Sequence, residues 1–315
     1  MSAIFEVVLP IFAIIAAGYG CGRAGLLGAA SSEALNGYVF YVALPALFFL
    51  STAGAPLEQV LVWPYIATFL GGIAVSAALA VAVGRFAFPI GRREQVLHGM
   101  AAIFSNTGYM GIPLLTQLYG EPGILPAVIG TLCTGTLVMP LCMAALQATA
   151  DDRGGALAGM ARGLGMVARN PFVAATALGL VWAALFGPAT LPDPAQRFCE
   201  MLAATAGPCA LFAMGLFMVG RSIASGWRES LWLTVVKLTV QPALTFVLAR
   251  WVFALDPFLT ACAVVLAGLP TGTLVFVVAQ RAGLYVQRAT ATIILSTAVS
   301  VVTLSVILVL FADAP

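Results

Sequence analysis

Two short stretches of the sequence combine small polar side chains with glycine and proline in a way that suits the binding of a small anion. One runs from Ser105 to Pro113 and the other from Ala267 to Thr273, and both lie in otherwise apolar segments. A proline inside a helix removes a backbone hydrogen bond and clashes with the preceding turn, so each stretch should interrupt its helix. A helix that restarts offers free N–H groups and about half a positive charge, which favours a carboxylate. The residues predicted to bind substrate are Asn106, Thr107, Gly111, Pro113, Pro270, Thr271, Gly272 and Thr273.

One basic residue, Lys237, lies inside an apolar segment, where a cation costs about 2.5–3.5 kcal/mol to insert into a membrane. Lys237 and Gln241 are four residues apart and therefore share one face of a helix. Two roles are open for Lys237: it attracts the anionic substrate, or it is a structural counter-charge that extends toward the cytoplasmic interface. We predict that Lys237 and Gln241 give electrostatic support to the site.

The composition places these motifs in a membrane. Of the 315 residues, 62% are hydrophobic and 8% are charged, whereas soluble proteins carry about 25% charge. The net charge of +2 is too small and too dispersed for a nucleic-acid partner. The six cysteines form no CxxC pair and are expected to be packing residues, and no metal or cofactor is predicted.

The single histidine, His98, follows a basic loop and is expected to anchor its helix at the membrane interface. Glu229 is expected near a helix end, where a charge is cheap. A membrane-embedded enzyme would need a nucleophile–base pair or a metal cluster, and one histidine without an acidic cluster inside a span argues against it.

Apolar runs near the ~20 residues needed to cross a bilayer predict ten transmembrane helices. Eleven of the 14 Lys and Arg residues fall in the odd-numbered loops and two in the even-numbered ones. Because cytoplasmic loops retain positive charge, the odd loops are predicted to be cytoplasmic and both termini periplasmic or extracellular. The predicted helices span residues 4–22, 34–52, 61–84, 95–118, 123–148, 169–187, 198–220, 229–252, 257–280 and 289–311.

The chain divides into a first five-helix repeat at 1–148, a cytoplasmic linker at 149–168 and a second repeat at 169–315. Because each half has an odd number of helices, the second half must enter the membrane from the opposite face, as in many secondary transporters. Prolines recur at nearly constant spacing: Pro10 and Pro171 are 161 residues apart, Pro45 and Pro208 are 163 apart, and Pro113 and Pro270 are 157 apart.

Either motif alone could be a proline kink or a glycine packing face. Two interrupted segments at equivalent places in the two repeats favour a binding site, because such pairs mark the substrate site of many transporters.

The Ser105–Pro113 motif and the run from Lys237 to Gln241-Pro242 resemble the auxin efflux carrier family of bacterial and plant permeases, whose bacterial members include malonate and malate transporters. The resemblance covers essentially the whole chain. It implies an organic-anion carrier in which broken helices four and nine cross at their prolines and one subdomain moves past a scaffold in an elevator-like cycle. Scaffold helices often form a homodimer in this family. Relatives often place Asn about four residues after the second proline, where this chain has Leu274, so contacts on that side come from Thr271, Thr273 or backbone.

The sequence therefore predicts an all-α membrane protein of a bacterial inner membrane that transports a short mono- or dicarboxylate such as malonate. A coupling proton or sodium ion is open, and a symporter of the bile-acid type is the main alternative. No span contains an adjacent Asp pair, which argues against a carboxylate-based proton or sodium exchanger. A sensor, an enzyme and a channel are weaker alternatives.

Overall fold

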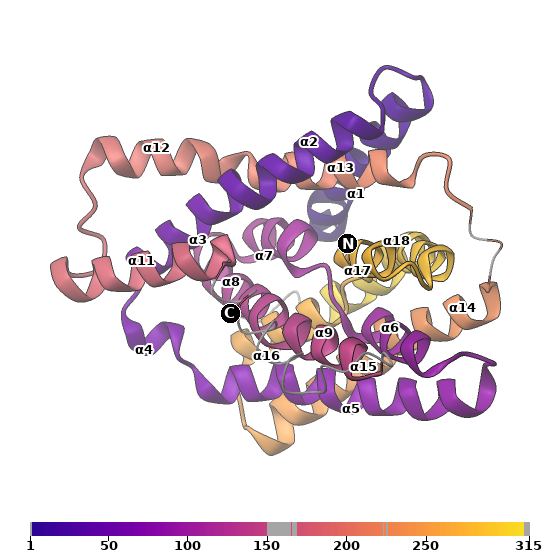
Figure 1. The fold of residues 1–315 in the computed structure, drawn as a ribbon. Helices are drawn as coiled ribbons and strands as arrows, with labels where there is room; N and C mark the ends of the chain where they lie inside the picture. The colour runs from indigo at the N-terminus through magenta and orange to yellow at the C-terminus, as the bar shows by residue number, and fades with distance from the viewer. Residues whose placement is uncertain (1, 150–164, 166–168, 223, 225, 312–315) are drawn as a thin grey trace. The chain divides into compact units, whose positions relative to one another are not determined.

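The computed structural model describes residues 2–149, 165, 169–222, 224 and 226–311, and these ranges are almost entirely helical (Figure 1). Within them no strand forms, and the one isolated antiparallel bridge joins Ser105 to Thr271. Most of the predicted linker at 149–168 lies outside the described residues. Six helical segments of the described chain are long and apolar enough to cross a membrane: Ala29–Ala53, Glu58–Ala87, Glu121–Ala148, Asp193–Met218, Trp227–Val252 and Val286–Leu310.

These observations confirm an all-helical membrane protein. The ten-helix inverted arrangement and the orientation of the termini stay predictions.

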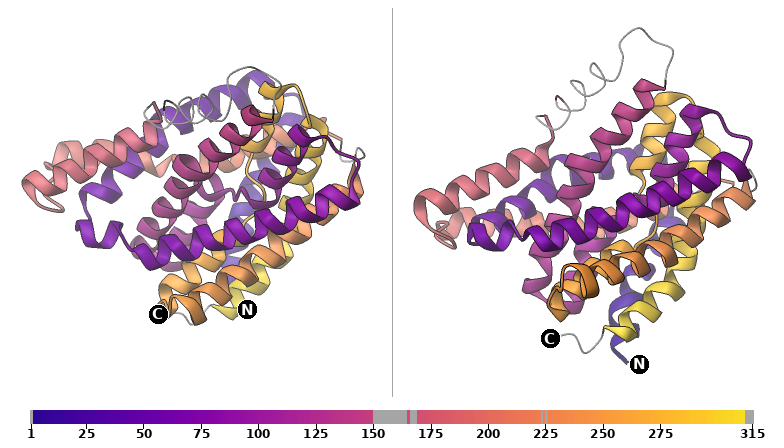
Figure 2. Two further views of the ribbon diagram at one scale, coloured as in Figure 1. Left: turned by 60° about the horizontal axis from the view of Figure 1, so that its bottom comes forward. Right: turned by 90° about the horizontal axis from the view of Figure 1, so that it is seen from below.

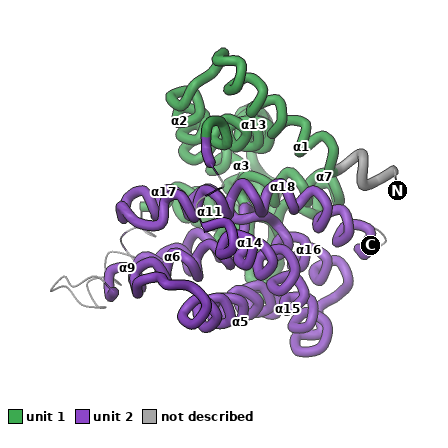
Figure 3. The backbone as a smooth tube through the Cα atoms, turned by 90° about the vertical axis from the view of Figure 1, so that its right-hand side faces the viewer, with its two compact units in different colours: residues 1–63, 108–132, 168–220 green, residues 64–107, 133–167, 221–315 purple. Residues whose placement is uncertain are grey.

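The chain forms two compact units, each built from segments of both predicted repeats (Figure 3). Unit 1 comprises residues 1–63, 108–132 and 168–220, and unit 2 comprises residues 64–107, 133–167 and 221–315, as far as these are described. The compact units are therefore not the two sequence halves.

Unit 1 is made of short and medium helices. In chain order they are α1 (Ser2–Arg23), α2 (Ala29–Tyr38), η1 (Val39–Ala43), α3 (Leu44–Ala53), α4 (Leu57–Val60), α7 (Ile112–Tyr119), η3 (Glu121–Gly123), α8 (Ile124–Leu132), α11 (Pro171–Phe186), α12 (Asp193–Ala204) and α13 (Ala206–Met218); η2 (Thr107–Gly111) begins one residue before this unit's second segment.

Glycines bring two helix pairs of unit 1 into backbone contact. Gly18 of α1 faces the carbonyl oxygen of Phe212 in α13, and Gly179 of α11 faces the carbonyl oxygen of Phe49 in α3. A Cβ atom at either glycine would overlap that carbonyl, so only glycine allows the helices to approach so closely. Gly18 and Gly179 are 161 residues apart, and Phe49 and Phe212 are 163 apart. These are the spacings of the first two proline pairs.

Unit 2 contains the longest helices. They are α5 (Trp63–Ala87), α6 (Arg92–Ile103), η4 (Cys133–Val138), α9 (Met139–Ala148), α14 (Trp227–Val235), η5 (Val236–Val240), α15 (Gln241–Val247), η6 (Leu248–Val252), α16 (Pro257–Ala267), α17 (Leu274–Ala282) and α18 (Val286–Leu310). Helix α5 packs along α15 and η6, where Gly72 faces Thr245 and Gly71 faces Leu248 (Figure 2).

Four prolines within the apolar segments each follow a π-helical turn. The turns η1, η2, η4 and η5 end two residues before Pro45, Pro113, Pro140 and Pro242. A proline cannot donate to the carbonyl four residues earlier and its ring clashes there, and a wider turn accommodates both effects. At these places the helix continues through the proline instead of ending at it.

Candidate functional site

The helical path of unit 2 is interrupted twice, once after α6 and once after α16. The backbone that follows α6 pairs in antiparallel fashion with the backbone that follows α16. The Asn106 N–H donates to the Pro270 carbonyl at 2.9 Å, and the Gly272 N–H donates to the Phe104 carbonyl at 2.8 Å. We call residues Phe104–Asn106 and Pro270–Gly272 the crossing. Its buried non-helical backbone is tolerated because these bonds satisfy its polar groups.

The two helices that end at the crossing have their last carbonyls bonded by polar side chains. Lys237 Nζ donates to the Ala267 carbonyl at 2.5 Å, and Gln241 Nε2 donates to the Ile103 carbonyl at 3.3 Å. The final carbonyls of a helix have no partner within it and carry partial negative charge, which a basic group complements. Lys237 and Gln241 are both fully buried. Lys237 and Gln241 therefore each bond the end of a different helix from the face that they were predicted to share. The lysine nitrogen bonds a carbonyl in the protein interior.

Thr271 also holds the crossing together. Its hydroxyl donates to the Ala101 carbonyl at 2.9 Å, and its N–H donates to Ser296 Oγ at 3.1 Å. A threonine hydroxyl has a single proton, so in this conformation it has none left to donate to an anion.

The other polar groups at the crossing differ in their hydrogen-bond partners. Ser105 Oγ and Gln241 Oε1 are buried and have no hydrogen-bond partner among the described residues. Asn106 is 5% exposed, Thr107 shares a hydrogen bond of 3.2 Å with Thr134, and Thr273 is half-buried at the N-cap of α17. The structure thus gathers six of the eight predicted substrate-binding residues in unit 2: Asn106, Thr107, Pro270, Thr271, Gly272 and Thr273.

The other two predicted residues, Gly111 and Pro113, are not part of unit 2. They belong to unit 1, where Gly111 ends η2 and Pro113 is near the start of α7. A Cβ atom on Gly207 would lie 3.1 Å from Pro113 Cβ, so α13 approaches Pro113 closely. The backbone partner of Pro270 is Asn106, seven residues before Pro113. The family resemblance implies that the two broken helices cross at Pro113 and Pro270. The backbone pairing found within unit 2 instead joins Pro270 to Asn106.

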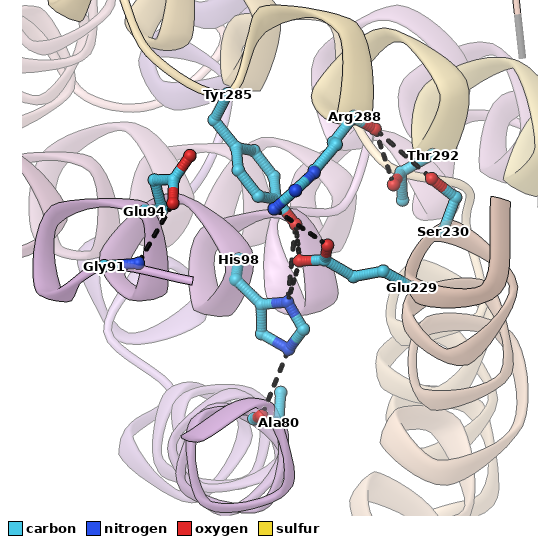
Figure 4. Close-up of polar contacts among 9 residues, drawn as sticks. All are labelled: Ala80, Gly91, Glu94, His98, Glu229, Ser230, Tyr285, Arg288 and Thr292. Atoms are coloured by element: carbon cyan, nitrogen blue, oxygen red, sulfur yellow. Dashed lines mark hydrogen bonds and ion pairs between the residues drawn. The ribbon is translucent and has the colours of Figure 1, made fainter. Parts of the chain in front are cut away.

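The expectation for His98 is wrong: it does not anchor an interface but is fully buried. Its Nδ1 lies 2.6 Å from Glu229 Oε1, and its Nε2 lies 3.2 Å from the Ala80 carbonyl (Figure 4). Glu229 is also buried, at 3% exposure, so its place near a helix end does not leave it in solvent. The two residues are 131 positions apart, and no local sequence pattern links them.

Tyr285 and Arg288 complete this second polar cluster of unit 2. The Tyr285 hydroxyl donates to Glu229 Oε1, and the Arg288 guanidinium lies 3.2 Å from Glu229 Oε2 (Figure 4). We call His98, Glu229, Tyr285 and Arg288 the histidine cluster. Burial raises the pKa of Tyr285 well above its usual value, and the negative charge of Glu229 raises it further, so this hydroxyl stays protonated.

Together these features define a polytopic helical membrane protein with interrupted helices and polar groups in its interior. A family model described as membrane transport protein matches residues 3–153 and 165–308. The chain belongs to this family of membrane transporters, and the resemblance to auxin efflux carriers is confirmed.

Three curated relatives illustrate the family. A "Putative malonate transporter" of Rhizobium meliloti is 35% identical over 315 aligned residues, which cover 98% of this chain and 96% of the relative. An "Uncharacterized transporter" of Methanothermobacter thermautotrophicus is 25% identical over 309 residues, with 95% of each chain covered. "Auxin efflux carrier component 8" of Arabidopsis thaliana is 30% identical over 120 residues, covering 37% of this chain and 32% of the relative. The relatives are named as transporters, in agreement with the prediction that this chain is not an enzyme.

Proposed function

We propose that this protein is a secondary active transporter for a small organic carboxylate, with malonate as the best candidate. The observation that carries the proposal is the crossing, which places buried polar groups between two interrupted helices of a transporter-family chain. The name of the Rhizobium meliloti relative supports malonate.

The anion contacts in this proposal come from the side chains of Asn106, Thr107 and Thr273 together with the N-terminus of α17. An amide and hydroxyl groups donate to a carboxylate, and the positive end of the helix dipole attracts it. Thr271, Gly272 and Pro270 hold the crossing in shape. Lys237 and Gln241 do not contact the anion in this proposal. They bond the carbonyls of two helix ends and so offset a partial negative charge that would otherwise repel the anion.

We further propose a five-plus-five inverted repeat and an elevator-type cycle. The equal spacings of the Gly18–Phe212 and Gly179–Phe49 contacts support the repeat, since duplicated halves would reproduce a contact at the repeat offset. Most segments lie in the same unit as their expected counterpart in the other half. Residues 108–132 are an exception, because they belong to unit 1 and their expected counterpart belongs to unit 2. The crossing lies wholly within unit 2, so this unit would carry the substrate while helices of unit 1 act as the scaffold and form the homodimer.

The proposed location is a bacterial inner membrane with both termini periplasmic or extracellular. The histidine cluster supports placing three of the odd-numbered loops on one membrane face, because its residues come from three segments near those loops, and the charge bias makes that face cytoplasmic. These segments are the middle of α6, the first turn of α14 and the turn between α17 and α18 (Figure 4). Within unit 2 the three segments meet, as loops on one membrane face should.

The proposal is tested with purified protein in liposomes and radiolabelled malonate. Asn106→Ala should abolish saturable uptake, because it removes the amide that donates to the carboxylate. Asn36→Ala is the matched control, since the Asn36 side chain bonds Ser32 of its own helix and no other residue in the part of the chain that the structure describes. Folding of both variants is checked by size-exclusion chromatography. Wild-type uptake by the Asn106→Ala variant would remove Asn106 from the site.

A further inference from the structure

The histidine cluster is a buried group of titratable side chains that the proposed substrate site does not use. It joins α5, α6, α14 and the turn before α18, through Ala80, His98, Glu229 and Tyr285. His98 is fully buried, and the ring of Phe88 packs against it at a centroid distance of 5.7 Å. Burying several ionisable groups in a membrane protein is expensive, and such groups commonly mark proton or ion pathways.

The hydrogen-bond geometry fixes how many protons the cluster holds. The Ala80 carbonyl can only accept, so His98 Nε2 must carry a proton. At 2.6 Å from Nδ1, Glu229 Oε1 would face a bare lone pair unless a second proton lies between them. The Tyr285 hydroxyl is also 3.3 Å from Nδ1, but its single proton goes to Glu229 Oε1 at the shorter contact. That proton resides either on the imidazole, opposite a carboxylate, or on the carboxyl group, opposite a neutral imidazole. In both forms the His98–Glu229 pair binds one exchangeable proton.

The charged groups around the His98–Glu229 pair are consistent with proton exchange between the pair and the protein surface at one edge of the cluster. Arg288 faces Glu229 from α18 and is 30% exposed, so the cluster reaches the surface through this residue. Tyr285 donates to Glu229, and the charge of Glu94 on α6 acts on Tyr285. Loss of the shared proton would set a lone pair against an anionic oxygen in a buried position, and this repulsion would weaken the contact between α6 and α14.

We propose that His98 and Glu229 form the proton-binding site of this transporter, and that loading and unloading of this site couples carboxylate transport to a proton gradient. The coupling part rests on the proposed transport function. The sequence argued against a carboxylate-based proton exchanger because no span contains an adjacent Asp pair. The structure offers a histidine–glutamate pair from two distant segments instead.

Glu229→Gln is the informative variant because its amide keeps the shape of the cluster. With its amide nitrogen in the place of Oε1, the glutamine donates to Nδ1 of a neutral His98 and to the Tyr285 oxygen, and its amide oxygen faces Arg288 in the place of Oε2. This imitates the loaded state without a titrating carboxyl group. Two assays are made on proteoliposomes: exchange of labelled for unlabelled malonate at equal pH on both sides, and net uptake driven by an acidic exterior. The variant should retain exchange and completely lose gradient-driven accumulation.

Glu200→Gln is the matched control, since Glu200 is an exposed residue of α12 in unit 1, where it accepts from Gln196. It should retain both activities. His98→Asn is a second uncoupling variant, because its amide donates to Glu229 but holds no exchangeable proton. Gradient-driven accumulation by a folded Glu229→Gln variant at the wild-type level would overturn the proposal.

A measurement without substrate separates this proposal from the transport function. Infrared difference spectra of the wild type between acidic and alkaline buffers should show a carboxyl or imidazole signal that is lost in Glu229→Gln. Identical spectra for the two proteins would overturn the proton site, even if transport is found. A wild type that exchanges no malonate would instead contradict the proposed function, and the infrared signal would still decide whether the proton site exists.

Discussion

Replacement of Thr271 by valine tests whether this residue holds the crossing together. The change keeps the side-chain shape and removes the hydroxyl that donates to the Ala101 carbonyl at 2.9 Å. Ala101 is in the last turn of α6, where a carbonyl has no partner within the helix. Thr271 is fully buried, so water does not replace the lost bond. An unsatisfied buried acceptor costs about 1–3 kcal/mol, and we expect the free energy of unfolding to fall by this amount.

Thr297→Val is the matched control for this prediction. Thr297 is also buried and donates to the Ile293 carbonyl at 2.7 Å, but that carbonyl lies within α18 and accepts a regular helical bond as well. Its loss should cost less than about 1 kcal/mol. Denaturant titration in mild detergent measures both variants. If Thr271→Val is as stable as Thr297→Val, Thr271 does not hold the crossing. If it leaves stability unchanged and raises only the KM for malonate, Thr271 is a substrate contact instead.

Two further predictions address the packing of unit 1 and the histidine cluster. Gly179→Ala should destabilise the protein by about 1–3 kcal/mol in thermal unfolding, because the new Cβ would lie 2.6 Å from the Phe49 carbonyl oxygen. Gly37→Ala is the control: a Cβ at Gly37 would meet no atom within 4 Å, so this change should be neutral or stabilising. Equal Tm values for the two variants would contradict close packing of α3 and α11. Tyr285→Phe should flatten the alkaline side of the stability profile. The raised pKa keeps Tyr285 protonated in the folded state above the usual value of 10.0, so wild-type stability falls as pH rises past that value, and parallel profiles would refute this assignment.

The sequence could predict features that depend on residues close together or on regular spacing. The four-residue separation of Lys237 and Gln241 placed them on one face, and both donate to helix ends. The offsets of the proline pairs reappear in the contacts of Gly18 and Gly179. Apolar composition predicted a helical membrane protein, because only helices or closed barrels satisfy the backbone in lipid.

Partners that are distant in the chain could not be predicted in this way. Ala267 is 30 residues from Lys237, and Glu229 is 131 residues from His98. A histidine near a helix start looks the same in sequence whether it faces lipid headgroups or a buried carboxylate. The role of Pro113 was also beyond the sequence, because a π-helical turn before it lets the helix continue, while the interruption lies at Phe104–Asn106.

The central claim is that this chain carries a carboxylate through a site that opens to one side at a time. Counterflow measures this most directly: proteoliposomes are loaded with unlabelled malonate and diluted into a trace of labelled malonate. A carrier returns from the inside bound mostly to unlabelled substrate, so the label should accumulate transiently above its external concentration. Entry of label only up to the external concentration, as through a channel, or no entry above that of protein-free liposomes, would contradict the claim.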